Sequence, residues 1–314
     1  MLVFFIHGVA NKDASYSRQL EGLIQEDLNH RGIPLPIFCA SFWGNTFKRT
    51  DHIWNCIHDD LKDLGKSYPT VDVRDVFRYQ EFRKDFVSEF FGDILTYFNT
   101  ERGKDIREDI VNQLQKFIAL HPEHDEIHLV THSLGSVVIW DVLFSDRFSS
   151  DDPAFKMREL LSLNENSIGS MSKKLKSITT MGSPILFFNL MLEMNPTRIK
   201  EFTEKFQKGP IRWINIIHSS DIIAYPLKAS LDIKLLPLLP NLYFRDKYIW
   251  ADANILEKGA RMGQANTVMA NAAMAVGVSD SHKYYWGSRG TARLISANLV
   301  GDLAEIEALK IDTW

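Results

Sequence analysis

The residue of greatest chemical interest is Ser133, which stands at the sharpest turn that the sequence predicts. Residues 127–130 form the short apolar run of a buried strand, and from Ser136 onward apolar residues recur at helical spacing. No linker separates the two elements, so the serine at the apex is expected to hold a strained backbone conformation. A serine hydroxyl is a weak nucleophile at neutral pH unless an imidazole accepts its proton and a carboxylate orients that imidazole. The chemistry predicted for this turn is therefore nucleophilic, and it requires a histidine and an acid.

Two later residues occupy places where such partners are expected. Residues 211–217 are predicted to form a strand, and Asp221 lies in the loop just past it. In open parallel sheets, catalytic groups gather outside the carboxyl ends of the strands, which favours Asp221 as the acid. His282 lies in a loop before the final predicted helix, 291–309. The alternatives are that Asp221 only caps the next segment and that His282 is a surface histidine. Other candidates are Asp246, Asp252 and Asp280 for the acid, and His7, His132 and His218 for the base.

The sequence around Ser133 resembles the nucleophile elbow of the α/β-hydrolase family, whose pattern is G-x-S-x-G. Here the tetrapeptide H-S-L-G at 132–135 follows Thr131, which takes the place of the first glycine. The family order of serine, acid and histidine along the chain is matched by Ser133, Asp221 and His282. The resemblance therefore implies that these three residues form a catalytic triad.

Two further segments carry the resemblance. The segment 281–286 is similar to the histidine loop of lipase-like and esterase-like members of the family. His7 and Gly8, which follow the first predicted strand, resemble the family's H-G oxyanion motif. A tetrahedral oxyanion needs two N–H donors. The resemblance implies that the backbone of Leu134 supplies one donor and that Gly8 or Val9 supplies the other.

The elements that must position these residues alternate between strand and helix. Apolar runs at 2–6 and 36–42 flank a helical pattern at 14–30, which makes a β-α-β unit and implies a parallel sheet. One further strand is predicted at 175–181. The expected fold class is α/β, with a mainly parallel central sheet flanked by helices and with helical insertions. As the resemblance also implies, we expect a single α/β-hydrolase domain over 1–314.

Two stretches depart from this alternation. Residues 45–100 are rich in aromatic and charged residues, and they are predicted to be a helical insertion that either packs on the core or caps a substrate pocket. Residues 226–250, rich in leucine and proline, are predicted to be a lid or surface excursion, with core packing and shallow membrane contact as alternatives. Smaller predicted features are a polar surface excursion at 149–172, a buried helix at 185–194 and a helix at 254–276.

Composition excludes several other classes of function. The chain has 314 residues, of which 45% are hydrophobic and 24% charged, as in ordinary globular proteins. A net charge of −4 without a basic run gives no reason to expect a nucleic acid partner. Two cysteines, Cys39 and Cys56, indicate a reducing compartment, and no signal peptide or membrane-spanning stretch is recognised. A cytoplasmic protein without a metal or cofactor is expected, because no phosphate-binding loop or metal-ligand motif is present.

The expected function is hydrolysis of carboxylic esters by a serine enzyme of esterase or lipase type, acting through an acyl-enzyme. The expected partner is a small acyl ester or lipid-like substrate. The alternative is a non-catalytic binding protein of the same fold, which the departure at Thr131 favours. Thioesterases, peptidases and acyltransferases share the same triad, and the sequence does not choose among them.

Overall fold

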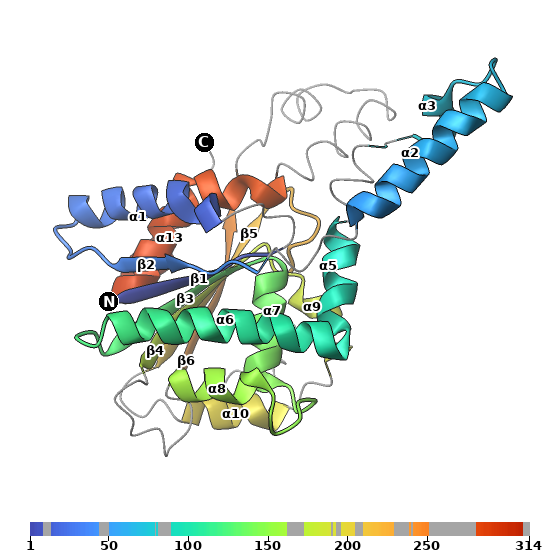
Figure 1. The fold of residues 1–314 in the computed structure, drawn as a ribbon. Helices are drawn as coiled ribbons and strands as arrows, with labels where there is room; N and C mark the ends of the chain where they lie inside the picture. The colour runs from blue at the N-terminus through green and yellow to red at the C-terminus, as the bar shows by residue number, and fades with distance from the viewer. Residues whose placement is uncertain are drawn as a thin grey trace.

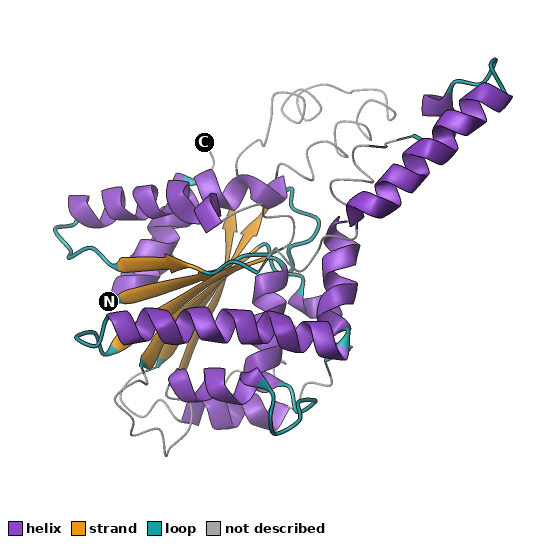
Figure 2. Cartoon of the chain, viewed as in Figure 1, coloured by secondary structure: helices purple, strands orange, loops and turns teal. Residues whose placement is uncertain are grey.

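The computed structural model describes residues 1–8, 14–43, 50–78, 80, 89–161, 173–189, 191–192, 196–204, 210–228, 239, 241–250 and 281–309. Within these residues the chain forms a six-stranded sheet with helices on both faces (Figures 1 and 2). The strands are β1 (Leu2–Ile6), β2 (Ile37–Ala40), β3 (Glu126–His132), β4 (Lys174–Met181), β5 (Ile211–His218) and β6 (Leu242–Ile249). The helices are η1 (Ala14–Ser17), α1 (Arg18–His30), α2 (Thr50–Ser67), α3 (Val73–Val76), α5 (Glu89–Phe98), α6 (Thr100–Leu120), α7 (Leu134–Phe144), α8 (Pro153–Leu160), α9 (Ile185–Phe188), α10 (Pro196–Glu204), η5 (Tyr284–Gly287), α13 (Arg289–Val300) and α14 (Leu303–Ala308).

The sheet confirms the predicted α/β fold class. Its strand order is β2-β1-β3-β4-β5-β6, and each neighbouring pair is parallel. Parallel neighbours require crossover connections, which is why helices lie between most strands in the sequence. The carboxyl ends of β1, β3, β4 and β5 consequently lie side by side at one edge of the sheet.

Strand β1 shows why the central strands read as continuous apolar runs. Val3 and Phe5 pack in the same hydrophobic cluster as the buried residues of α1 and α13. Leu2, Phe4 and Ile6 pack in a second cluster with α6 and α7. Both faces of the sheet are therefore covered by helices, as parallel sheets require, and every residue of β1 is buried.

Strand β6 corrects one expectation. Residues 226–250 were expected to form a lid or surface excursion, but Leu242–Ile249 pairs in parallel with β5 along its whole length. The alternation of apolar and polar residues that would reveal β6 in the sequence is interrupted, because this edge strand carries the charged run Arg245-Asp246-Lys247. Charged residues are common on edge strands, where they discourage pairing with other chains. Before β6, Leu227 and Leu239 are buried in the core, as the core-packing alternative expects. The lid prediction is untested for 229–238 and 240, which lie outside the described residues.

Helices occupy the range predicted for the insertion. In α5, Ile94 and Tyr97 are buried in the core, so this helix follows the core-packing interpretation. Helices α2 and α3 instead extend away from the sheet (Figure 1). Trp54 of α2 is buried and lies near Phe77, with ring centroids 6.2 Å apart.

Three smaller predictions differ from the structure. The excursion at 149–172 contains α8, whose apolar face is buried. Of the helix predicted at 185–194, the described residues form the four-residue α9, and 190 and 193–194 lie outside the description. The helix predicted at 291–309 divides into α13 and α14 at Gly301, which adopts a left-handed conformation with φ 80°. The helix predicted at 254–276 lies outside the described residues. No described helix has the length and apolar character needed to cross a membrane.

Candidate active site

The turn at Ser133 has the strained geometry expected from the sequence. Strand β3 ends at His132 and helix α7 begins at Leu134, so Ser133 alone makes the turn. Its φ is 53° and its ψ is −126°, and among the described residues it is the one non-glycine with a positive φ. The N–H of Ser133 donates to the carbonyl of Met181 at the end of β4 (2.9 Å). Strain of this kind persists only where the surroundings hold it, and it is common at functional sites.

Two glycines allow neighbouring backbone to approach this turn. A Cβ atom at Gly135 would lie 2.5 Å from the carbonyl oxygens of Ile6 and His7, so the first turn of α7 rests directly on the end of β1. A Cβ atom at Gly8 would lie 2.4 Å from the Cβ of Ser133 and 3.0 Å from its Oγ. Only glycine fits at these contacts without a shift of the backbone.

Thr131 fits where the family pattern has glycine. Its side chain is fully buried, and its Oγ1 shares a hydrogen bond with the Oγ of Ser136 (2.9 Å) across the turn. The small side chain of Ser136 leaves room for the threonine and satisfies its hydroxyl. The departure from the pattern therefore leaves the geometry of the turn at Ser133 intact.

The structure brings Ser133, His282 and Asp221 together. The Nε2 of His282 lies 2.8 Å from the Oγ of Ser133, and its Nδ1 lies 2.9 Å from the Oδ2 of Asp221. The three residues come from the ends of β3 and β5 and from the segment before α13. All three are buried: the exposed fraction is 0% for Ser133, 4% for His282 and 5% for Asp221. Hydrogen bonds in such a dry environment are stronger than those exposed to water.

The environment of Asp221 favours its charged form. Burial alone would raise its pKa, but the neighbouring imidazole of His282 acts in the opposite direction. Its Oδ1 accepts a hydrogen bond from the N–H of Ile223 (3.0 Å), and its Oδ2 accepts one from the hydroxyl of Tyr285 (2.8 Å). The pKa of Asp221 is consequently held below its usual value. An ionised carboxylate requires a donor at the Nδ1 of His282, which leaves Nε2 as the acceptor for the Ser133 hydroxyl.

Tyr285 is a site residue that the sequence analysis did not identify. The stretch 281–287 forms helical turns, which place Tyr285 three residues after His282 and on the same side. The i, i+3 spacing of the two residues is the signal that could have revealed the contact. The tyrosine is completely buried, and burial together with the nearby charge of Asp221 raises its pKa well above the usual value. Its hydroxyl therefore keeps its proton and remains a donor.

The rival histidines have other partners. The Nε2–H of His132 donates to the backbone carbonyl of His282 (2.7 Å), and burial lowers the pKa of His132 to about 3. The Nε2 of His7 accepts a hydrogen bond from the N–H of Trp43 (3.3 Å), its Nδ1 bonds to the carbonyl of Gly8, and burial lowers its pKa to about 4. Both rings are thus neutral and fixed. The ring of the third rival, His218, accepts a hydrogen bond at Nδ1 from a backbone N–H two residues on (3.2 Å).

The one rival acid that the structure describes, Asp246, has other partners. Asp246 lies on β6 and accepts hydrogen bonds from the side chain of Asn215 (2.8 Å) and from the N–H of Leu227 (2.9 Å). It anchors the segment after β5. Asp252 and Asp280 lie outside the described residues.

The backbone donors expected for an oxyanion are described in part. Leu134 opens α7, so its N–H is one of the first-turn amides that have no partner within the helix. Gly8 lies against Ser133 at the end of β1. Val9 lies outside the described residues. Among the residues that the structure describes, no group of three or more metal-ligating side chains comes together.

Comparisons with known proteins identify no family for this chain. A scan against models of protein families found no match to the chain, and a search of the curated proteins found none either.

Proposed function

We propose that this protein is a serine hydrolase that cleaves carboxylic esters, with Ser133, His282 and Asp221 as its catalytic triad. The observation that carries the proposal is the position of His282, whose two ring nitrogens lie within hydrogen-bond distance of the serine hydroxyl and the carboxylate. The strained backbone of Ser133 is a second, independent feature that supports it. Nucleophile, base and orienting acid in this mutual geometry define the triad on unrelated folds.

In the proposed mechanism, Ser133 Oγ attacks the acyl carbonyl while His282 Nε2 takes the hydroxyl proton. The backbone N–H of Leu134, with the loop at Gly8, stabilises the oxyanion of the tetrahedral intermediate. His282 then passes its proton to the leaving alcohol, and the acyl-enzyme forms on Ser133. A water molecule then attacks the acyl carbonyl while His282 takes its proton, and the second tetrahedral intermediate collapses as His282 returns that proton to Ser133 Oγ, which releases the carboxylic acid and restores the serine. Asp221 stays ionised and stabilises the imidazolium in both steps.

Covalent labelling tests the proposal most directly. A fluorophosphonate probe reacts with an activated serine, so the wild-type protein is expected to be labelled and Ser133→Ala to remain unlabelled. Ser296→Ala is the matched control, because it removes an equally buried serine hydroxyl on α13, outside the site. Mass spectrometry of the labelled peptide should place the modification on Ser133.

Hydrolysis of p-nitrophenyl esters of increasing acyl length then addresses the substrate. Loss of at least about 1000-fold in kcat is expected for Ser133→Ala, because the covalent route is lost. Folded wild-type protein that neither reacts with the probe nor hydrolyses any ester would contradict the proposal and favour the binding-protein alternative. Higher rates with thioesters or amides would keep the triad and change the substrate class.

A further inference from the structure

The buried hydroxyl of Tyr285 contacts the acid of the proposed triad, Asp221. It donates to Asp221 Oδ2 (2.8 Å), the same oxygen that faces His282 Nδ1. It also accepts a hydrogen bond from the backbone N–H of His218 (2.8 Å), the last residue of β5. The tyrosine thus links the end of β5 to the acid through a hydroxyl whose donor and acceptor capacities are both used.

Close packing fixes the position of this hydroxyl. A Cβ atom at Gly182 would lie 3.0 Å from both Asp221 Oδ2 and Tyr285 Cε2, and 3.1 Å from His282 Cε1. Gly182 itself adopts a φ of 57°, which favours glycine. The backbone after β4 therefore presses against the carboxylate, the phenol and the imidazole together, and it leaves Asp221 little freedom to rotate.

We propose that Tyr285 is a positioning residue of the catalytic site, which holds the Asp221 carboxylate in place for His282 and tunes the proton affinity of the Asp221–His282 pair. The inference rests on the proposed function. Two coupled groups titrate as a pair, so a donor to the carboxylate lowers the affinity of the pair for its proton. Among the described residues, the other titratable groups that face this cluster are the imidazoles of His132 on β3 and His218 on β5. The Tyr285 hydroxyl bonds to Asp221 and to the backbone of β5, so its effect on the chemistry passes through Asp221.

Tyr285→Phe tests the proposal because it removes the hydroxyl and keeps the ring. Hydrogen bonds to charged groups are the strong ones, so kcat for p-nitrophenyl acetate is expected to fall on the order of tenfold. The KM is expected to stay unchanged. The value of kcat/KM falls at low pH, where the Asp221–His282 pair takes up a proton; this fall is the acid limb of the pH profile. Without the hydrogen bond from Tyr285, the pair takes up that proton more readily, so the acid limb is expected to move to higher pH.

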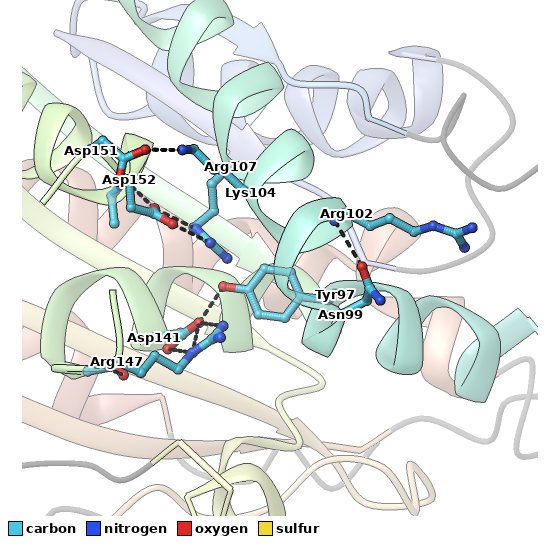
Figure 3. A network of polar contacts seen from close by, with 11 residues as sticks. Tyr97, Asn99, Arg102, Lys104, Arg107, Asp141, Arg147, Asp151 and Asp152 are labelled. Carbon is cyan, nitrogen blue, oxygen red and sulfur yellow. Dashed lines mark hydrogen bonds and ion pairs between the residues drawn. The ribbon is translucent and has the colours of Figure 1, made fainter. Parts of the chain in front are cut away.

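The chain offers a matched control in Tyr97→Phe. Tyr97 is also fully buried, and its hydroxyl donates to Asp141 Oδ2 (2.6 Å), a buried carboxylate outside the site (Figure 3). Both substitutions remove a buried tyrosine hydroxyl from a carboxylate, so both are expected to lower the melting temperature. Only Tyr285→Phe should change kcat and the pH profile.

The outcomes separate this inference from the function on which it rests. Wild-type protein that does not react with a fluorophosphonate would overturn the proposed function and this inference with it. Wild-type labelling, together with a Tyr285→Phe variant whose kcat and acid limb are unchanged, would overturn the inference alone. An equal loss of kcat in Tyr97→Phe would also overturn it, since the effect would then be one of stability.

A second substitution covers the case in which Tyr285→Phe does not fold. Site-specific incorporation of 3-fluorotyrosine at position 285 retains the shape of the side chain and makes its hydroxyl a stronger donor. The acid limb should then move to lower pH, in the direction opposite to that expected for Tyr285→Phe. A limb that stays at the wild-type position would contradict the proposed role of Tyr285.

Discussion

Gly8 is packed so closely against Ser133 that position 8 has no room for a side chain. The space that a side chain at position 8 would need is already filled by the Cβ and Oγ of Ser133 and by the carbonyl of His132. The same contact brings the backbone of Gly8 to the edge of Ser133, where the proposed mechanism would form its oxyanion. The absence of a side chain at position 8 is therefore part of the geometry of the site.

Gly8→Ala is expected to reduce ester hydrolysis by about 100-fold, because the new Cβ displaces the Ser133 side chain and a displacement near 1 Å can have that effect. The measurement is kcat/KM on a p-nitrophenyl ester. Gly22→Ala on α1 is the control, since a Cβ atom there meets nothing within 4 Å and alanine favours the helix. Equal activity of the two variants would show that the contact between Gly8 and Ser133 has no catalytic importance.

At this scale the sequence predicted much of the candidate site. Ser133 was predicted from its turn, Asp221 from its place past a strand, and His282 from a chain order that resembles that of α/β-hydrolases. The structure brings the three residues together. Tyr285 was not singled out, because a tyrosine at helical spacing is most often a core residue. Thr131 could be judged only with Ser136 in view, since whether its side chain fits depends on the size of a neighbour across the turn.

At the scale of elements, polar contacts join the helices that surround the elbow helix α7. Asp141 of α7 accepts hydrogen bonds from Tyr97 of α5 and from the Nε of Arg147 (2.9 Å), as Figure 3 shows. Nearby, Arg107 of α6 donates through Nε to Asp152 (2.8 Å), which also caps α8. On this face of the sheet, α5 and α7 are thus connected by a buried hydrogen bond, and α6 and α8 by a buried ion pair.

The adjacent residues Asp151 and Asp152 allow the contribution of a buried ion pair to stability to be measured. The Arg107–Asp152 pair is buried, with side chains 3% and 5% exposed, whereas the neighbouring Lys104–Asp151 pair is 39% and 69% exposed. Asp152→Ala leaves a buried arginine unpaired, so it should lower the free energy of unfolding by about 3–5 kcal/mol. Asp151→Ala should lower it far less, because both charges of the Lys104–Asp151 pair are already solvated by water. Urea denaturation measures both values, and similar losses would contradict the difference in burial.

The central strands could be predicted because helices cover both faces of the sheet and force continuous apolar sequence. Strand β6 could not, since an edge strand tolerates the charges of Arg245-Asp246-Lys247 and loses its alternation. The final helix was predicted as one element because apolar spacing continues across Gly301. That single left-handed residue divides it into α13 and α14.

At the scale of the whole molecule, the fold keeps three histidines neutral in its interior. Burial lowers the pKa of His7 to about 4 and those of His128 and His132 to about 3. In the unfolded chain they would take up protons below about 6.5. Between these values the unfolded state binds more protons than the folded state, so stability falls as the pH decreases. The lowered pKa of Asp221 makes stability fall in a separate pH range, below about pH 3.9, where the unfolded chain takes up a proton at this carboxylate.

Lowering the pH from about 7 to about 5 is expected to reduce the free energy of unfolding by about 2 kcal/mol for each of these histidines. Urea denaturation at the two pH values measures the total. His128→Gln should reduce the difference by roughly one third, because His128 lies on β3 and its only described side-chain hydrogen bond is to Ser177. Equal stability at the two pH values would contradict the neutral state of these rings.

The position of β1 also has a consequence for how the protein is made. Its five buried residues lie between β2 and β3, and Phe4 pairs with Leu129, which is synthesised far later. At about 5–20 residues per second, the ribosome needs on the order of ten seconds to reach the partner strand. During that time this apolar segment can pair only with the short strand β2, and its contacts with the distant strand β3 form slowly. Chaperone binding to nascent chains should accordingly be strongest before β3 emerges.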